Sequence, residues 1–400
     1  MRISTSNVFD ANVSMLNQQQ STLLHTNQQV SSGRRMMSPG DDPIAASNVL
    51  HVAQADASNN QLATNRNTAK SAIGLAEATL QSVTSLLQDV KTMSVQAGNG
   101  TLSPADKQSI GTALQGRLEE LIGLANSSDG AGNYLFSGYQ GKTLPFVNTA
   151  LGVQYMGDDG QRMVQVSAAR QMPTSDSGAD IFMRIKSGNG KFVTEASASN
   201  IGTASISQGS VTDAALLTGS TYKLTFSNPT TFDVSNGKGE IVSQGNSFVS
   251  GEAVTLPGML ISLTGTPEPG DAFTVSPSAH EGLFKVLSDL ITALNTSNPA
   301  GDAATSAQFS SNLDKALSGF DQGLDRILTV RAALGARLNE LDSLQATGED
   351  MGLQYKQTLS NLQDLDYNKA ISDLNRQTTS LQAAQKSFKQ VAELTMFNYM

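Results

Sequence analysis

Residues 43–97 read PIAASNVLHVAQADASNNQLATNRNTAKSAIGLAEATLQSVTSLLQDVKTMSVQA, and this stretch decides the fold class of the chain. Its seam residues alternate at spacings of three and four without a slip, which is typical of a helix that packs along its whole length. Asp42 and Pro43 favour a helix start, because Asp caps the first turn and Pro at the first helical position wastes no N–H. Gly98 ends the pattern, so we expect a helix of about 55 residues, roughly 80 Å long. Its seam comprises Leu62, Arg66, Ala69, Ile73, Ala76, Leu80, Val83, Leu87, Val90, Ser94 and Ala97.

Helical patterns lie on both sides of this stretch. An earlier seam ends at Ser32-Gly33, where Gly permits the left-handed cap. Ser103-Pro104 with Asp106 starts a further helix, which ends near Asn126. The earlier seam comprises Val13, Leu16, Gln20, Leu23, Asn27 and Val30.

The C-terminal part of the chain, from about residue 281, is also helical in pattern. One short stripe covers 283–294 and a second covers 324–344. After Gly348 and Gly352 the stripe resumes with Leu359, Leu362 and Leu365 and continues to the end of the chain. This last seam comprises Ile371, Leu374, Thr378, Leu381, Gln385, Phe388 and Val391.

Between these helical parts, residues 133–280 change to the period of two that marks strands. Alternating apolar residues occur at 222–226, 259–263 and 273–275, and turn clusters recur between them. Val153/Tyr155 and Val164/Val166 flank Asp158-Asp159-Gly160, which predicts a hairpin at that turn. The sequence therefore predicts an α+β multidomain protein: a long coiled-coil-like helical rod from both chain ends with an inserted all-β domain.

The terminal seams are narrow, and a lone helix of 20–30 residues is marginal in water, so each seam needs a partner. An ordinary intramolecular coiled coil is one alternative. Packing against neighbouring copies is the other, and two features favour it: both seams lie at the chain ends, and polar residues interrupt them, which can fix register in a larger bundle. The predicted assembly interface comprises Val13, Leu16, Leu23, Val30, Ile371, Leu374, Leu381, Phe388 and Val391.

Composition narrows the function classes. The net charge is −9 and no basic run exceeds Arg34-Arg35, which argues against nucleic acid as a partner. Absence of Cys removes disulfides and thiolate chemistry. No apolar stretch approaches the ~20 residues that span a bilayer, so we expect no membrane insertion. The N-terminus lacks an apolar core segment, so we expect no cleaved signal peptide.

Motifs for catalysis or cofactors are missing. The three His residues are scattered without metal-ligand spacing, and no G-x-S-x-G elbow is present. The glycine-rich stretches 188–191 and 237–239 complete no phosphate loop and are better interpreted as hairpin turns. Asp41-Asp42 and Asp158-Asp159 fit a helix cap and a turn better than a cation site. We therefore expect no enzyme, no cofactor and no metal, although paired carboxylates of a hydrolase would be visible only in three dimensions.

Several stretches, in this order and with a β insert between them, resemble the flagellin superfamily. The opening 1–5 and residues 133–139 are more similar to its hook-associated junction subunits than to filament subunits. The match covers about residues 1–140 and 310–400. One departure is Asp89 before Val90, where many flagellins carry an Arg that contributes to innate-receptor recognition, so that activity is not expected here. The remaining motifs are Ser31-Ser32-Gly33-Arg34-Arg35, Asp41-Asp42-Pro43-Ile44-Ala45-Ala46, Ser94–Gly100, Gln115–Leu121 and Arg331–Asn339.

The resemblance implies a three-part organisation. Terminal helices 1–42 with 356–400 would form an inner tube wall and be disordered before assembly. A helical rod, 43–132 with 281–355, would form the outer wall, and the β domain 133–280 would project outward.

The resemblance also implies partners and a location. It implies a homo-oligomeric ring at the hook–filament junction of an extracellular flagellum, next to another hook-associated protein and flagellin. It further implies type III export without a cleaved signal, and a cytoplasmic chaperone on the C-terminal helix. Alternatives are a flagellin, a stalked extracellular hydrolase, and a secretion-needle translocator or adhesin stalk.

Overall fold

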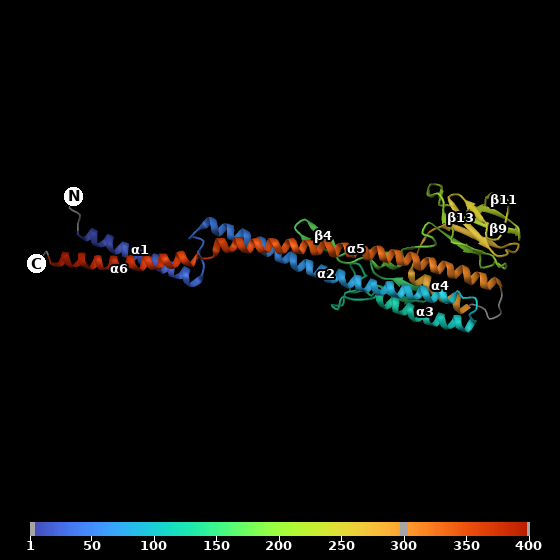
Figure 1. Ribbon diagram of the computed structural model, residues 1–400, viewed down its shortest axis with the longest axis horizontal. Helices are drawn as coiled ribbons and strands as arrows, with labels where there is room; N and C mark the ends of the chain where they lie inside the picture. Colours follow the sequence, from blue (N-terminus) through green and yellow to red (C-terminus); the bar gives the residue numbers. More distant parts are fainter. Residues whose placement is uncertain (1–4, 297–302, 398–400) are drawn as a thin grey trace. The chain divides into compact units, whose positions relative to one another are not determined.

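The structure, a computed structural model, describes residues 5–296 and 303–397 (Figure 1). Long helices come from both ends of the chain, and the strands lie between them in sequence. The predicted α+β class, with helices from both chain ends and an inserted β region, is confirmed. The helices are α1 (Thr5–Ser32), α2 (Pro43–Ala97), α3 (Pro104–Ala125), α4 (Leu283–Thr296), α5 (Ala303–Gln363) and α6 (Tyr367–Phe397).

The chain divides into two compact units. One consists of residues 1–64 with 343–400 and is called here the terminal unit; the other consists of residues 65–342 and is called the central unit. Helices α2 and α5 contribute residues to both units. The finer three-part division expected from the sequence stays a prediction.

Helix α2 buries the seam that the sequence predicts. From Arg66 to Ala97 every residue of that seam is less than 9 % exposed, and Leu80, Val83 and Leu87 are fully buried. Leu62 alone is half-buried. The helix starts as expected, because the Asp42 carboxylate accepts a hydrogen bond from the Ala45 N–H at 3.0 Å.

Helix α3 also has the predicted ends. Ser103 and Asp106 form a reciprocal capping box, and Asn126 is the C-cap. Helix α3 packs against α4. Six apolar side chains of α4 are at most 4 % exposed and form the helical core with α2 and α5: Leu283, Phe284, Val286, Leu287, Leu290 and Leu294.

The C-terminal helices differ from the sequence pattern at one point. Helix α5 continues through Gly348 and Gly352, but the stripe expected to run on from Leu365 is interrupted at residues 364–366, and α6 begins at Tyr367. Asp366 caps the new helix, because its carboxylate accepts from the Lys369 N–H at 3.1 Å. The helix is therefore interrupted at a place where the regular spacing of apolar residues continues.

Two sheets form the larger β layer of the central unit. A five-stranded sheet has the order β11-β10-β9-β14-β6, and a second sheet has the order β12-β13-β7, with β8 also paired to β13. These strands are β6 (Phe192–Ala196), β7 (Ser205–Ile206), β8 (Ser210–Val211), β9 (Tyr222–Asn228), β10 (Thr231–Asn236), β11 (Ile241–Ser247), β12 (Ala253–Leu256), β13 (Met259–Thr264) and β14 (Ala272–Pro277).

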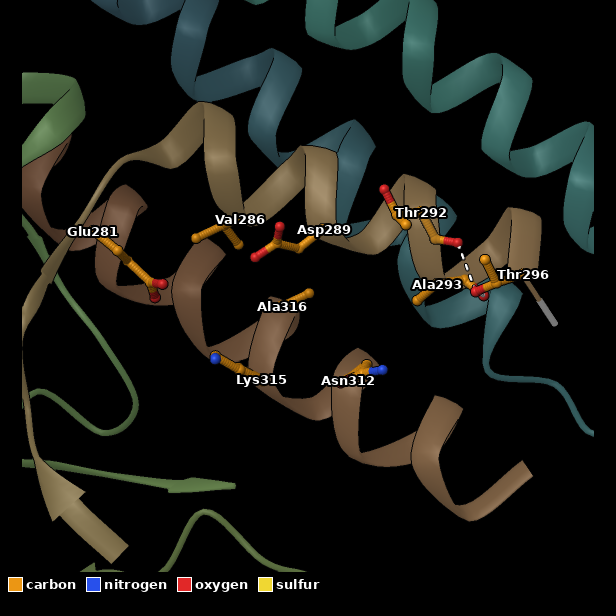
Figure 2. Close-up of a pocket in the computed structure, with 9 residues that line it drawn as sticks. All are labelled: Glu281, Val286, Asp289, Thr292, Ala293, Thr296, Asn312, Lys315 and Ala316. Carbon is orange, nitrogen blue, oxygen red and sulfur yellow. Dashed lines mark hydrogen bonds between the residues drawn. The ribbon is translucent and has the colours of Figure 1, made fainter. Parts of the chain in front are cut away.

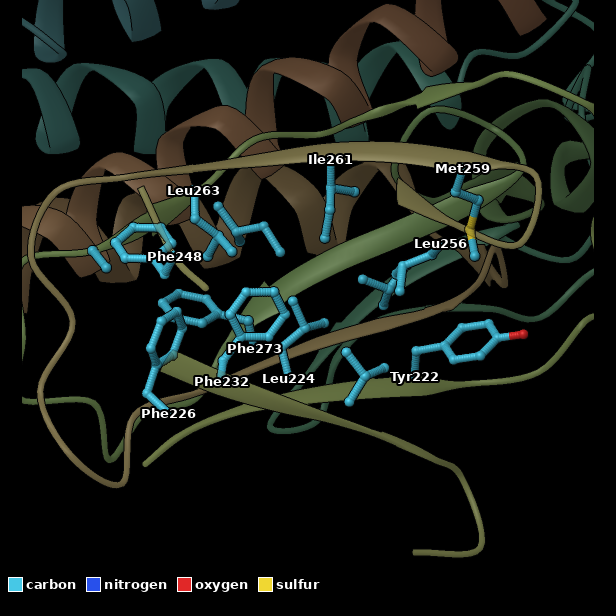
Figure 3. Close-up of a cluster of buried hydrophobic side chains, with 14 of the residues drawn as sticks. Tyr222, Leu224, Phe226, Phe232, Phe248, Leu256, Met259, Ile261, Leu263 and Phe273 are labelled. Carbon is cyan, nitrogen blue, oxygen red and sulfur yellow. The ribbon is translucent and has the colours of Figure 1, made fainter. Parts of the chain in front are cut away.

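The two sheets enclose one apolar core, which Figure 3 shows. Phe226 packs against three other rings of this core, with ring centroids of Phe232, Phe248 and Phe273 at 5.5, 5.2 and 6.0 Å. Strand β9 alternates buried and outward side chains, as its period of two predicts.

Short hairpins precede this sandwich. The structure has β1 (Phe146–Thr149) paired with β2 (Gly152–Tyr155), and β3 (Met163–Ser167) paired with β4 (Arg170–Pro173). The further short elements are a π-helix η1 (Ala179–Met183), a 3-10 helix η2 (Ala214–Leu216), and β5 (Ile185–Lys186) paired with β15 (His280–Glu281).

The hairpin predicted around Asp158-Asp159-Gly160 is therefore wrong, since β2 and β3 do not pair with each other. Residues 158–160 instead form a loop between β2 and β3, and side-chain contacts hold this loop in place. The Asp158 carboxylate accepts from the Tyr139 and Gly160 N–H groups, both at 2.8 Å. The Asp159 carboxylate binds the Arg184 guanidinium at 2.6 Å. The stretch 188–190 is likewise a turn between strands that are not paired with each other, whereas the turn at 237–239 does join the paired strands β10 and β11.

Candidate assembly interface

Helices α1 and α6 pack against each other and run side by side in Figure 1. Near one end of the pair, the rings of Phe9 and Phe388 have centroids 5.1 Å apart. Near the other end, the Leu365 N–H donates to the Gly33 carbonyl at 3.0 Å. The pair is therefore antiparallel. With equal rise along both helices, this register sets Leu16 level with Leu381, and Leu23 level with Leu374.

The predicted interface residues are only partly covered by this pairing. Seven of them are half-buried: Val13, Leu16, Leu23, Val30, Leu374, Leu381 and Phe388. Ile371 is 48 % exposed, and the side chain of Val391 lies outside the described residues. The polar seam positions Gln20, Asn27 and Gln385 are exposed. The contact between α1 and α6 thus leaves most of each seam open on one side.

The sequence pattern missed the residues that the pair covers most fully. Thr26 and Ala370 are 7 % and 5 % exposed. Between the helices lies a cavity of about 160 Å³, lined in part by Gln19 and Gln377. The side-chain oxygens of both Gln residues are buried and have no hydrogen-bond partner in the part of the chain that the structure describes. No signal in the spacing of three and four distinguishes Gln19 from Gln20.

Among the side chains that the structure describes, the terminal unit buries no large apolar residue completely. Among its described side chains, the buried ones are small or polar: Thr26, Ala45, Asn59 and Ala370. Large apolar residues stand in solvent instead, with Ile44 77 %, Leu50 69 % and Leu353 70 % exposed. In the central unit the reverse holds, since most of its large apolar seam residues are buried. Hydrophobic burial is the main driving force of folding. The terminal unit therefore has less of this stabilisation than the central unit.

The motif Ser31-Ser32-Gly33-Arg34-Arg35 joins the two chain ends. Gly33 adopts a left-handed φ of +69°, which ends α1. A Cβ at this position would also stand 2.9 Å from the Tyr367 hydroxyl, so a larger residue would displace that ring. The Arg35 N–H donates to the Gln363 carbonyl at 2.8 Å. The Arg35 guanidinium Nη2 donates to the Leu362 carbonyl at 3.0 Å, which satisfies the last turn of α5.

Asp41 organises the loop between α1 and α2. Its carboxylate Oδ2 accepts from the Met37 and Ser38 N–H groups at 2.7 and 2.9 Å. These backbone bonds, with lesser help from the Ser38 hydroxyl and from His25, lower the pKa of Asp41 to about 2. The loop is therefore built around an ionised carboxylate. That role agrees with the structural interpretation of the Asp41-Asp42 pair.

Chemical sites of other kinds are not assembled in the described part. No group of three or more His, Asp or Glu residues is placed to hold a metal ion within residues 5–296 and 303–397. Over the same ranges, no helix is long and apolar enough to cross a bilayer.

Similarity to known proteins extends over the full chain. The family profile "Bacterial flagellin N-terminal helical region" matches residues 3–141. Flagellar hook-associated protein 3 of Salmonella typhimurium is 31 % identical over 397 residues, which is 99 % of each chain. The chain belongs to the hook-associated protein 3 family. Its fold agrees: the crystal structure of the flagellar junction protein from Legionella pneumophila is 30 % identical, covers 79 % of this chain and 100 % of its own, and has a TM-score of 0.72.

Similarity to filament subunits is much shorter. Phase 1 flagellin of Salmonella naestved is 30 % identical over 153 residues, which is 38 % of this chain and 26 % of the flagellin. The hook-associated protein 3 family thus accounts for the whole chain, whereas flagellin accounts for a part of it. Members of the family are structural components of the flagellum.

Proposed function

We propose that this chain is the subunit that joins hook to filament in a bacterial flagellum, and that its role is structural, without catalysis. The observation that carries the proposal is a terminal unit whose described side chains include no completely buried large apolar residue, found in a chain that matches hook-associated protein 3 from end to end. A protein that worked alone would gain nothing from leaving Ile44, Leu50 and Leu353 in water. A subunit of a larger structure gains the surfaces that its neighbours cover.

The mechanism that we propose is differential packing. In the isolated chain, α1 and α6 cover each other only in part. At the hook tip, neighbouring copies supply the missing surface, and burial offsets the entropy of ordering the helices. Full burial of one large apolar side chain is worth roughly 1.5–3 kcal/mol, and six that are already half-buried would contribute on the order of 5 kcal/mol before that cost. The six are Val13, Leu16, Leu23, Leu374, Leu381 and Phe388.

The proposal includes an arrangement in the assembled tube. The terminal helices, 1–42 with 356–400, would form the inner wall. The helical part, 43–132 with 281–355, would form the outer wall, and residues 133–280 would project outward. The subunits would form a ring of identical copies, with another hook-associated protein and flagellin as neighbours.

Delivery to this place requires passage out of the cell. We propose type III export of an unfolded chain to the extracellular flagellum. The exposed apolar positions of α6 favour aggregation unless a cytoplasmic chaperone covers them before export. Absence of Cys suits an unfolded passage, because no disulfide can form on the way.

Deletion of the gene in its own bacterium tests the proposal. We expect hooks without filaments and flagellin released into the medium, with filaments restored by the wild-type gene. Filaments that persist without the gene product would contradict the junction role. If antibody labelling found the chain along whole filaments and in large excess over hook subunits, the protein would be a filament subunit instead.

A further inference from the structure

A groove of about 250 Å³ lies in the central unit between α4 and α5, and Figure 2 shows the side chains around it. Its apolar floor consists of Val286, Ala293 and Ala316. Charged side chains also line it: Glu281 just before α4, Asp289 on α4, and Lys315 on α5. The groove thus combines apolar and charged side chains. Neither feature belongs to the terminal helices discussed above.

Glu281 is the unusual group in this groove. Its side chain is half-buried, and its Oε1 atom is buried without a hydrogen-bond partner among the described residues. Burial raises the pKa of Glu281, against the attraction of Lys315 and Lys285. A buried carboxylate oxygen without a donor costs free energy in the isolated chain, so it calls for an explanation.

The lysine nearest in the groove does not satisfy this oxygen. The Lys315 amine is bound by the Glu195 carboxylate, and no ion pair joins it to Glu281. Asp289 is likewise engaged, since its carboxylate accepts from the Lys285 amine at 2.5 Å. The groove therefore keeps one carboxylate oxygen that accepts no hydrogen bond within the described chain.

The shape and the chemistry match one kind of occupant. A lysine side chain has an aliphatic stem that packs on apolar surface and an ammonium head that donates to carboxylates. The part of the floor nearest Glu281, formed by Val286 and Ala316, suits the stem, and Glu281 suits the head. We propose that this groove binds a lysine side chain of a second copy of this chain, with Glu281 as the acceptor.

The chain's own surface offers such lysines. Most described arginines are already held in ion pairs or by backbone carbonyls, such as Arg331 by Glu77 and Arg337 by Asp176. By contrast, Lys191, Lys223 and Lys238 are exposed, and none of them has an ion pair in the described part of the chain. A second copy is therefore a sufficient source of the donor. The inference rests on the proposed function, because it requires that copies meet in a ring.

Zero-length carbodiimide cross-linking tests the contact directly, since it joins a carboxylate to an amine only when the two touch. Equal amounts of unlabelled and ¹⁵N-labelled chain are added to hooks isolated from a strain that lacks the protein, and the links are read by mass spectrometry. We expect mixed-isotope links from Glu281 to a lysine in hook-bound protein, and none in the free chain. Links from Glu281 to Lys285 or Lys315 of its own chain alone would overturn the inference.

Two variants test whether the groove matters for assembly. Glu281→Gln should raise the concentration needed for half-saturation of hooks by about tenfold, the effect of one charge-assisted hydrogen bond. Its melting temperature should be equal or higher, because the amide relieves the cost of a buried carboxylate. Ala293→Leu changes the groove about 15 Å farther along α4, beyond the reach of a lysine bound at Glu281, and should bind hooks as wild type does. Glu252→Gln, an exposed glutamate of the β layer, is the matched control and should bind as wild type does.

The outcomes separate this inference from the proposed function. If wild-type chain does not bind hooks at all, the junction role fails. If wild type binds and Glu281→Gln binds equally well, with no mixed-isotope link, the junction role stands and the groove is not a docking site. A lower melting temperature of Glu281→Gln would show a structural role for Glu281 and would also contradict the inference.

Discussion

Arg35 and Leu362 are 327 positions apart in the sequence, yet the Arg35 guanidinium donates two hydrogen bonds to the Leu362 carbonyl, at 3.0 Å from Nη2 and 3.3 Å from Nε. That carbonyl belongs to the last turn of α5, where helical carbonyls lack partners within the helix. The N-terminal motif thus caps a helix from the other end of the chain. This contact joins the N-terminal and C-terminal segments of the terminal unit.

Replacement of Arg35 by Ala should loosen the junction between α5 and α6. We expect a local loss of about 1 kcal/mol, or about fivefold faster hydrogen exchange of the Leu365 amide, because the capping donors are gone. Native-state hydrogen exchange read by mass spectrometry measures this change. Arg34→Ala is the control, since Arg34 contributes its backbone to the bridge with Asp364. Equal acceleration in both variants would contradict the capping role.

The loop between α1 and α2 should be acid-sensitive through Asp41. Its folded-state pKa of about 2 lies below the ordinary value of 3.8, so the carboxylate contributes stability above about pH 4. That contribution is lost as the pH falls toward 2. A carboxyl NMR titration should give a midpoint near 2 for Asp41, and Asp41→Asn should abolish the acid dependence of the Met37 and Ser38 amide exchange. A midpoint near 4 would refute the assignment.

Leu381→Asp separates assembly from folding. The side chain is half-buried in the isolated chain, so we expect an unchanged melting temperature of the free chain. Binding to isolated hooks should weaken by more than about a hundredfold, because a charge would replace an apolar contact in the assembled wall. Gln382→Asp adds the same charge at an exposed neighbour and should have a much smaller effect. An unfolded variant, or normal binding, would argue against the proposed packing.

Arg337 and Asp176 form a largely buried ion pair of the central unit, with side chains 19 % and 16 % exposed. The two guanidinium nitrogens bind the two carboxylate oxygens at 2.8 and 3.1 Å. Arg337→Met should cost about 2 kcal/mol in denaturant unfolding, since it leaves a carboxylate with little solvent. Adding Asp176→Asn should recover part of the loss. A double variant less stable than the sum of the single variants would exclude this explanation.

Phe226 should be the most sensitive position of the β sandwich. It is 1 % exposed and touches three other aromatic rings. Phe226→Ala should lower the free energy of unfolding by about 3–5 kcal/mol, because it removes a ring and leaves a cavity. Val242→Ala, at a position 53 % exposed, should change it by less than about 0.5 kcal/mol. Similar losses in both variants would show that the cluster is not a core.

The elements that the sequence predicted well are those in which burial and period coincide. Helix α2 is one, because each seam residue from Arg66 onward meets a packed neighbour, so the pattern in the sequence and the burial in space are the same information. Strand β9 is another, with Tyr222, Leu224 and Phe226 on one face. In both elements the positions of the apolar residues alone identify the face that is buried.

The rest depended on contacts between distant residues. The stripe Leu359, Leu362 and Leu365 keeps its spacing through the break at 364–366, where backbone hydrogen bonds with Gly33 and Arg35 take the place of helical ones. The failed hairpin at Asp158 has the same cause, since Tyr139 and Arg184 anchor that loop from elsewhere. In the terminal helices, the pattern chose Gln20, whereas Gln19 faces the cavity. Because α1 and α6 bury few side chains, the sequence pattern does not identify which face of each helix points toward the other.

The small number of buried apolar side chains in the terminal unit has a practical consequence for how variants of this protein are judged. A melting curve of the free chain records the loss of the central unit, where the large side chains are packed. Substitutions on α1 and α6 scarcely move that curve, however damaging they are. A mutant library ranked by melting temperature would therefore classify those variants as neutral. A selection for motile cells would distinguish the variants that assemble from those that do not.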